Sequence, residues 1–256
     1  MTDVLGVIRS ATDLEFGICP YSAVSKRLIA CRAAERLPKD AKTVILFLFP
    51  YKVNAAPPKN ISRYAAVPDY HAVCGERLEK IAAALKASFP QNEFACFADN
   101  SPIPEVSAAV AAGLGCRGEN GLLITEKYGS FVFIGEIVTD LEVPSEIKSE
   151  RCIGCGKCRA ACPVSLDKSR CLSALTQKKG ELSAAEIEKL RSLGSIWGCD
   201  ICQEVCPQNR TPAAPLAEFS AGYRDEYVLG EDGTDRAYNW RRGAIERNAT
   251  FKKKRP

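Results

Sequence analysis

Apolar and polar positions alternate in blocks over the first 140 residues. Residues 43–49 (TVILFLF) form a continuous apolar run, which is typical of a strand buried on both faces. Between Pro68 and Ser88 the apolar residues recur at steps of three and four, which predicts an amphipathic helix. By the same criteria we predict helices over residues 3–13, 24–36 and 68–88 and one that ends at Ala112, and strands over residues 43–49, 94–98, 122–124 and 131–139, the last two joined by a Gly129-Ser130 turn. This alternation predicts an α/β (α+β layered) domain.

The pattern changes after about residue 140. Residues 144–150 are mostly polar and begin with a proline, which is typical of a linker, and a cysteine-rich segment follows them. After Pro207 the chain is loop-like, and its last residues are weakly patterned. We therefore predict three parts, which are an α/β domain at residues 1–147, a cysteine-rich domain at residues 148–215 and a C-terminal extension at residues 216–256.

Composition and charge restrict the class of protein. With 46% hydrophobic and 26% charged residues, the chain has an ordinary globular composition. No apolar run approaches the ~20 residues that span a bilayer, and the N-terminus has no signal-peptide pattern, so we expect a cytoplasmic protein without membrane association. Residues 1–150 have a net charge of −2 and residues 151–256 one of +6. This asymmetry indicates either nucleic-acid binding or compensation of anionic metal–thiolate clusters.

Cysteine is the most informative residue type in this chain. Eight of the 13 cysteines lie between Cys152 and Cys206. In a reducing cytoplasm, closely spaced cysteines are more often metal ligands than disulfide partners. Residues 152–163 have the pattern C-x2-C-x2-C-x3-C-P, in which three thiolates hold one [4Fe–4S] cluster and the fourth reaches a second cluster. Zinc is the main alternative, but zinc sites usually pair two short cysteine knuckles.

A second cysteine run completes the pattern. Residues 199–207 have the pattern C-x2-C-x3-C-P, which lacks the first cysteine of the motif, and Cys171 can supply the missing ligand. The exchange of the fourth cysteine between runs predicts two ligand sets and one-electron redox chemistry. The sets are Cys152, Cys155, Cys158 and Cys206 for one cluster and Cys162, Cys171, Cys199 and Cys202 for the other. The five scattered cysteines are typical of buried thiols.

The N-terminal domain contains two candidate proton-handling or ligand residues. Asp99 follows a predicted strand, where apolar neighbours could raise its pKa and make it a proton donor, or where it could bond only to its own turn. His71, the only histidine, is either an axial metal ligand or a residue of the first helical turn, and its position favours the second. The G-x-G-x-x-G at residues 113–118 follows a predicted helix and not a strand, so we expect no dinucleotide site there.

Several segments in combination resemble the epoxyqueuosine reductase family, which comprises cobalamin- and iron–sulfur-dependent enzymes of queuosine biosynthesis in tRNA. The resemblance covers roughly residues 30–210. The segments are S-R-Y-A at residues 62–65 with D-Y-H at 69–71, D-x-x-P-x-x-E at 99–105, A-G-L-G at 112–115, G-S-x-x-F-x-G-E-x-x-T-D at 129–140, R-C-x-S-x-L-T at 170–176 and G-C-D-x-C-Q-x-V-C-P-x-N at 198–209.

The resemblance implies a cobalamin-binding domain followed by a ferredoxin-like double [4Fe–4S] domain, with base-off cobalamin between them. It implies cofactor contacts, several through backbone atoms, from Ser62, Asp99, Leu123, Ile134, Ile137 and Ser173. It makes Asp99 the proton donor in the reduction of an epoxide to an alkene. Electrons would pass from a reduced ferredoxin or flavodoxin-type donor through the two clusters to cobalt.

Two departures from the family pattern keep other functions open. The family usually has a tryptophan where Cys116 stands, and it carries a C-terminal helical-repeat domain that helps to grip tRNA. That domain would begin near Trp240, close to the end of this chain. The alternatives are a cobalamin-dependent reductase of a small molecule, as in reductive dehalogenation, a ferredoxin-type electron carrier, and a protein that handles cobalamin without turnover.

Overall fold

The chain divides into two compact units. The computed structural model describes residues 3–210, 213–230, 236, 238–239 and 242–253. Unit 1 comprises residues 1–50 and 70–154, and unit 2 comprises residues 51–69 and 155–256. We predicted a single boundary near residue 147, but residues 51–69 group with the cysteine-rich part. Of the residues named above, Trp240 lies outside the described ranges.

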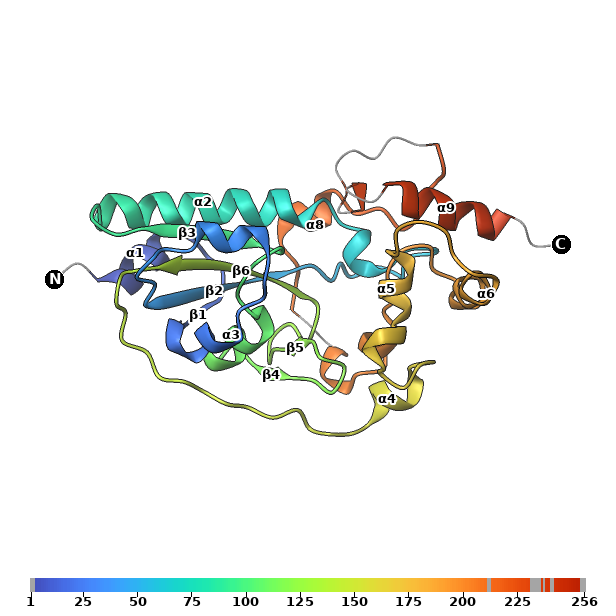
Figure 1. Ribbon diagram of the computed structural model, residues 1–256, viewed down its shortest axis with the longest axis horizontal. Helices are drawn as coiled ribbons and strands as arrows, with labels where there is room; N and C mark the ends of the chain where they lie inside the picture. The colour runs from blue at the N-terminus through green and yellow to red at the C-terminus, as the bar shows by residue number, and fades with distance from the viewer. Residues whose placement is uncertain (1–2, 211–212, 231–235, 237, 240–241, 254–256) are drawn as a thin grey trace. The chain divides into compact units, whose positions relative to one another are not determined.

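Unit 1 is built around a four-stranded sheet (Figure 1). Its order is β1-β2-β6-β3, and all three neighbouring pairs are antiparallel. The strands are β1 (Phe16–Pro20), β2 (Thr43–Pro50), β3 (Phe94–Ala98) and β6 (Val132–Thr139). The predicted strands at residues 43–49, 94–98 and 131–139 are confirmed, but the sheet has the antiparallel pairing of an α+β fold. A fully buried strand therefore does not by itself indicate parallel pairing.

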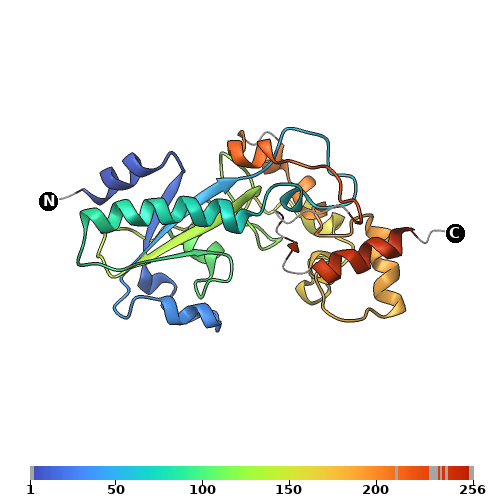
Figure 2. The ribbon, with the colours of Figure 1, turned by 90° about the horizontal axis from the view of Figure 1, so that it is seen from above.

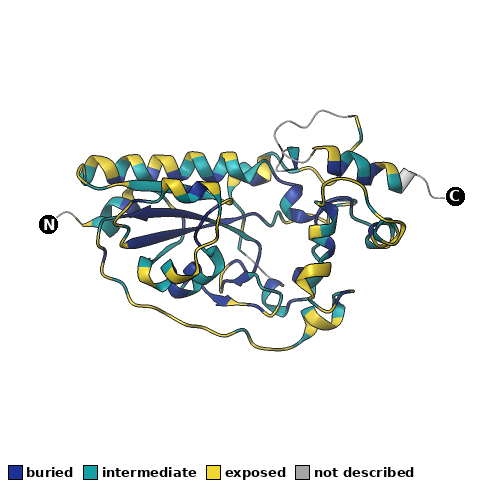
Figure 3. Ribbon diagram, viewed as in Figure 1, coloured by how far each residue is buried: buried dark blue, intermediate teal, exposed yellow. Residues whose placement is uncertain are grey.

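Helices cover both faces of this sheet. Helix α2 (Tyr70–Ser88) lies along one face, where α1 (Val4–Ala11) packs against it, and α3 (Glu105–Ala111) lies against the other (Figures 1 and 2). A Cβ placed on Gly135 would meet Leu78 of α2 at 2.9 Å. All eight residues of β2 are buried between these layers, which explains its continuous apolar sequence (Figure 3).

Two local predictions for unit 1 are wrong, and one strand was not predicted. Residues 24–36 form short 3₁₀ turns instead of a helix, and Leu28 is extended, because the Ile29 backbone N–H bonds to the distant Pro102 carbonyl. Strand β1, a short segment with a glycine and a proline, was not predicted. The expected hairpin around Gly129 does not form, because β5 (Leu123–Ile124) pairs with β4 (Cys116–Arg117) in a separate small sheet.

Unit 2 consists of short helices joined by loops. They are α4 (Lys157–Ala161), α5 (Leu172–Thr176), α6 (Ala184–Leu193), α7 (Ile201–Glu204), α8 (Ala217–Ala221) and α9 (Arg242–Lys253). Helix α6 begins with a capping box in which Ser183 and Glu186 bond to each other's backbone N–H. No helix within the described ranges is both long enough and apolar enough to cross a membrane.

The core of unit 2 joins three distant parts of the chain. Ile61 forms a parallel bridge with Trp197, which is 1% exposed, and Ile245 of α9 packs in the same cluster. Asn248 of α9 donates from Nδ2 to the carbonyls of Thr176 and Ile196 at 2.8 and 2.9 Å. The weakly patterned C-terminal extension is therefore part of this core. Its helix was not predicted because only a few of its positions are apolar.

Candidate functional site

The eight clustered cysteines lie in three segments of the sequence, and Cys152 falls in unit 1 whereas the other seven fall in unit 2. Cys158 belongs to α4 and Cys202 to α7, and these two helices pack against each other. Gly154 and Gly156 precede α4 with φ values of 65° and 69°, so glycine serves the backbone conformation at both positions. None of the thirteen cysteines, all within the described ranges, forms a disulfide.

The Cys199 thiol interacts electrostatically with two other cysteines of the second predicted ligand set. Burial raises the pKa of the Cys199 thiol, and the charges of Asp200, Cys171 and Cys162 raise it further. These electrostatic effects require Cys171 and Cys162 to lie close to Cys199. The Cys199 thiol is therefore within electrostatic range of Cys171 and Cys162, although Cys162 and Cys199 are 37 residues apart in the sequence.

The donor set fits iron–sulfur clusters in its chemistry. Seven thiols in two runs that end with Cys-Pro, together with Cys171, are the ligands that paired [4Fe–4S] clusters require. Among the described residues, no three His, Cys, Asp or Glu side chains are close enough together to hold one metal ion. That finding concerns a single ion, whose thiolate ligands lie about 4 Å from one another. In a cubic cluster each thiolate binds a different iron.

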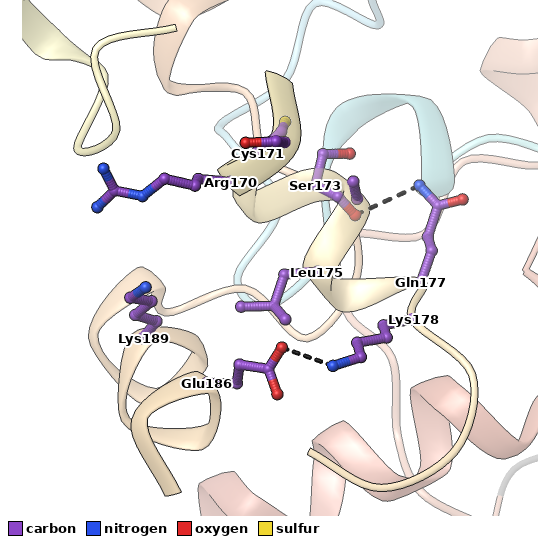
Figure 4. Close-up of a pocket in the computed structure, with 10 residues that line it drawn as sticks. Arg170, Cys171, Ser173, Leu175, Gln177, Lys178, Glu186 and Lys189 are labelled. Atoms are coloured by element: carbon purple, nitrogen blue, oxygen red, sulfur yellow. Dashed lines mark hydrogen bonds and ion pairs between the residues drawn. The ribbon is translucent and has the colours of Figure 1, made fainter. Parts of the chain in front are cut away.

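A charged pocket of about 790 Å³ lies beside Cys171 (Figure 4). Figure 4 shows Cys171 and Ser173 on one side and Lys189 with Glu186 on α6. Lys178 Nζ lies 2.7 Å from Glu186 Oε1, and this partly exposed pair closes one edge. Arg170 also lines the pocket, so the pocket presents more positive than negative side chains.

Ser62 and Ser173 are brought together although they are distant in sequence. Ser62 is 2% exposed, and its backbone N–H donates to the Trp197 carbonyl at 2.8 Å. The Tyr64 side chain hydrogen-bonds with Ser173 and accepts from Gln177 Nε2 at 3.3 Å. The Ser62 hydroxyl is buried beside the Tyr64 hydroxyl, which interacts with it, although Ser62 Oγ forms no regular hydrogen bond within the described ranges. A buried hydroxyl of this kind fits a polar group of a bound cofactor.

We expect Gly198→Ala to destabilise unit 2 more than Gly194→Ala. Both glycines have φ near 75°, but an added Cβ at Gly198 would lie 2.6 Å from Ser62 Cβ and 2.8 Å from Tyr64 Cε1. At Gly194 nothing lies within 4 Å, so this matched control measures the backbone strain alone, about 1–2 kcal/mol. Denaturant unfolding measures both variants. Equal losses of unfolding free energy would contradict the close packing of Ser62 on Gly198.

Asp99 lies at the end of β3 in a strained turn. Its φ is 59° and that of Asn100 is 46°, both in the left-handed region that favours glycine. The Asn100 backbone N–H donates to Asp99 Oδ1 at 2.7 Å. Tyr70 Oη donates to Asp99 Oδ2 at 2.8 Å, and His71 Nε2 lies 3.4 Å from the same oxygen. Two side chains from the start of α2 therefore converge on one carboxylate oxygen.

These contacts reverse the expected pKa shift of Asp99. The His71 interaction is the largest cause and, with the Asn100 N–H and Tyr70, lowers the pKa to about 2 although burial opposes it. The expectation of a raised pKa is therefore wrong, because the strand end supplies hydrogen-bond donors and not only apolar walls. His71 starts α2, as expected, but the interpretation as a mere helix-start residue missed its contact with Asp99.

Two further carboxyl groups, Glu105 and Glu136, lie near Asp99 in unit 1, and the sequence alone assigned them no role. Burial is the main cause that raises the pKa of Glu105 to about 7, followed by the Asp99 charge. Burial and the Glu105 charge raise the pKa of Glu136 well above its ordinary value. Glu136 is fully buried on β6 and accepts from Ser101 Oγ at 2.6 Å. The sequence signal for this site was that Glu136 is a lone charged residue within the apolar run of residues 131–139.

We expect Glu136→Gln to raise the Tm at pH 8 and to change it little near pH 4.5. The folded-state pKa of Glu136 is higher than its ordinary value of 4.5. Its protonated form therefore favours folding at low pH, and this contribution is lost as the pH rises through the folded-state pKa. Glutamine imitates the protonated form, and each 1 kcal/mol regained raises Tm by about 2–4 °C. Calorimetry at both pH values measures the Tm, with the exposed Glu126→Gln as control. An equal change in Tm at the two pH values would contradict the raised pKa of Glu136.

The remaining residues predicted as cofactor contacts lie on strands of unit 1. Leu123 is 3% exposed on β5, and Ile134 is partly exposed on β6. Ile137 is fully buried and is paired with Ile45 on one side and Cys96 on the other. Its side chain and backbone are both used within the core, so we leave Ile137 out of the proposed contacts.

Comparison with known proteins identifies the family. The epoxyqueuosine reductase of Cyclobacterium marinum is 32% identical to this chain over 229 residues, which are 83% of this chain and 74% of the relative. The chain belongs to the epoxyqueuosine reductase family. Residues 32–100 match the family model described as epoxyqueuosine reductase QueG, DUF1730. Residues 151–209 match that of a 4Fe–4S double cluster binding domain, so the chain carries such a domain.

Other members of the epoxyqueuosine reductase family match over shorter parts. The enzyme of Lactococcus garvieae is 34% identical over 188 residues, which are 67% of this chain and 53% of the relative. This chain spans about half the length of most of the curated relatives considered first. The solved structure from Streptococcus thermophilus covers 97% of this chain and 79% of its own, with a TM-score of 0.76 and 23% identity. This likeness confirms a mixed fold of helices and strands.

The cysteines outside the cluster domain are partly as expected. Cys19, Cys74 and Cys116 are buried, which confirms the interpretation as buried thiols. Cys31 and Cys96 are only partly buried. Burial is the main cause that raises the pKa of Cys19 to about 12 and of Cys96 to about 11. Both thiols are therefore unreactive at neutral pH.

Proposed function

We propose that this chain reduces an epoxide to an alkene, with epoxyqueuosine in tRNA as the substrate. Membership of the epoxyqueuosine reductase family supports the reaction type. One structure of similar fold, with a TM-score of 0.77 and 21% identity, is of an epoxyqueuosine reductase with an epoxyqueuosine-modified tRNA stem loop. The observation in this chain that carries the proposal is the convergence of Tyr70 and His71 on the exposed Asp99.

The eight clustered cysteines are proposed to hold two [4Fe–4S] clusters. The ligand sets are Cys152, Cys155, Cys158 and Cys206 for one, and Cys162, Cys171, Cys199 and Cys202 for the other. The electrostatic effect of Cys171 and Cys162 on the Cys199 thiol supports the second set. Each cluster is anionic, and the net charge of +6 in residues 151–256 offsets it.

Cobalamin is the proposed second cofactor, and with the clusters it supplies the electrons for the reduction when bound. The buried Ser62 hydroxyl, with Tyr64 and Ser173 beside it, supports a polar contact in unit 2. Asp99, Leu123 and Ile134 remain proposed contacts in unit 1. Ile134 lies on the part of β6 that is not paired with β3, so its backbone is free on that side.

Asp99 is proposed to handle the protons of the reaction. Conversion of an epoxide to an alkene and water consumes two electrons and two protons, and one proton must reach the departing oxygen. Asp99 is a carboxylate in the free chain, since its pKa is about 2. A substrate that excludes water from Asp99 would raise this pKa and let the carboxyl carry a proton. Tyr70 and His71 hold the carboxyl in one orientation for delivery.

An anaerobic assay tests this function. The full chain, loaded with iron, sulfide and cobalamin and supplied with a chemical reductant, is incubated with an epoxyqueuosine-containing tRNA stem loop. We expect mass spectrometry of the digested RNA to show loss of one oxygen from the modified base. A loaded chain that leaves this base unchanged would contradict the proposal that epoxyqueuosine in tRNA is the substrate. We further propose a reduced ferredoxin or flavodoxin as the electron donor. The same assay tests this donor when the reduced ferredoxin or flavodoxin replaces the chemical reductant. We also propose a cytoplasmic location.

A further inference from the structure

Arg63 is a buried cation that the function described so far does not use. Its side chain is only 7% exposed, and arginine is almost never buried unless it is paired. It belongs to residues 51–69, which group with unit 2. There the backbone N–H of the preceding residue, Ser62, donates to the Trp197 carbonyl at 2.8 Å. Arg63 therefore lies beside the residues that lead into the second cysteine run, residues 199–207.

Arg63 contacts both acidic residues of the second cysteine run. Its backbone N–H donates to Asp200 Oδ2 at 2.7 Å, and its side-chain Nε–H donates to Glu204 Oε1 in an ion pair. Asp200 directly follows Cys199, and Glu204 lies two residues after Cys202. Arg63 thus binds the run on both sides of Cys202, although more than 130 residues separate them in the sequence.

The charges at this contact bear directly on a cluster held by the run. A [4Fe–4S] cluster with four thiolate ligands is anionic, and its reduction adds one more negative charge. The carboxylates of Asp200 and Glu204 oppose that reduction, whereas the guanidinium of Arg63 favours it. At an effective dielectric constant of about 20, a unit charge about 10 Å from a cluster changes the ratio of reduced to oxidised cluster by about tenfold.

We propose that Arg63 raises the reduction potential of the cluster that Cys199 and Cys202 help to hold, here called the second cluster. Its guanidinium, fixed against Glu204, supplies a positive charge beside two acidic residues and so makes the second cluster easier to reduce. The inference rests on the cluster ligands proposed above and not on the substrate. The other cluster takes a single ligand from this run, so we expect its potential to change less.

The first test is a redox titration, followed by EPR spectroscopy, of the full chain reconstituted anaerobically with iron and sulfide. In Arg63→Gln we expect one cluster signal to move to lower potential, by about 59 mV for a tenfold change in the reduced-to-oxidised ratio. Arg63→Lys keeps the positive charge and should keep most of the wild-type potential. The matched control is Arg242→Gln, which removes an exposed arginine paired with Glu246 at 2.8 Å in the same unit. An unchanged potential in Arg63→Gln, or an equal fall in Arg63→Lys, would overturn the inference.

The second test uses Glu204→Gln and decides the matter even where Arg63→Gln loses its cluster. The Glu204 side chain is 37% exposed, so the substitution removes a negative charge at the edge of the run while Arg63 stays in place. We expect the potential of the second cluster to rise, which is the opposite of the change in Arg63→Gln. A contact with a purely structural role would not give opposite signs.

The signal that is absent from Cys202→Ser identifies the second cluster in both tests. A potential that does not rise in Glu204→Gln, or a shift confined to the other cluster, would overturn the inference. Shifts of the expected signs in a chain that leaves epoxyqueuosine unchanged would uphold the role of Arg63 and contradict only the proposed substrate.

Discussion

Asp99→Asn should lower epoxide reduction by about 10²–10⁴-fold while the chain keeps its clusters and cobalamin. Asparagine has nearly the same shape, tolerates left-handed φ and can still accept hydrogen bonds from Tyr70 and His71. It cannot gain and release a carboxyl proton. The loss should therefore appear in kcat, measured by mass spectrometry of the product under saturating substrate.

The control for Asp99→Asn is Asp40→Asn, which changes an exposed turn aspartate of the same unit. It should leave turnover unchanged. Iron, cobalt and Tm of both variants should match those of the wild type, since the Asp99 side chain is 55% exposed. Wild-type turnover by Asp99→Asn would show that another group delivers the proton, and His71 would be the first to examine.

Cys202→Ser should remove one of two clusters and abolish turnover with a physiological donor. Cys202 is assigned to the set with Cys162, Cys171 and Cys199, so its loss should reduce iron from about eight to about four atoms per chain. The other cluster has four ligands that the substitution leaves in place. Iron and sulfide analysis of anaerobically reconstituted protein measures the change.

Cys31→Ser is the matched control, since Cys31 is a partly buried cysteine outside the cluster domain. It should keep the full iron content. An unchanged iron content in Cys202→Ser would refute the ligand set, and loss of all iron would show that the two clusters do not assemble independently.

The cysteine spacing carried more information than any other feature of the sequence. Local spacing within residues 152–163 and 199–207 determines which metal chemistry the loops can support, so the cluster domain could be predicted before any fold was known. Continuous apolar runs likewise predicted β2 and β6. Pairing was not predictable, because a run buried on both faces looks the same in parallel and antiparallel sheets. The helix predicted at residues 24–36 does not form, because a long-range hydrogen bond of the Ile29 backbone N–H replaces helical bonding.

The position of Asp99 was predictable, but its environment was not. The motif places a carboxyl after β3, whereas its pKa depends on Tyr70 and His71, which come from a helix start about thirty residues earlier. The buried Glu136 depends in the same way on Ser101 from another element. Contacts between distant segments determine both pKa shifts, and one sequence without its fold does not contain them.

The central claim is that eight cysteines hold two [4Fe–4S] clusters that serve a bound cobalamin. Metal and sulfide analysis of the full chain, reconstituted anaerobically with iron, sulfide and cobalamin and then desalted, tests it most directly. The account predicts about eight iron, eight sulfide and one cobalt per chain. Zinc in place of iron, or a chain that retains no cobalt, would contradict it.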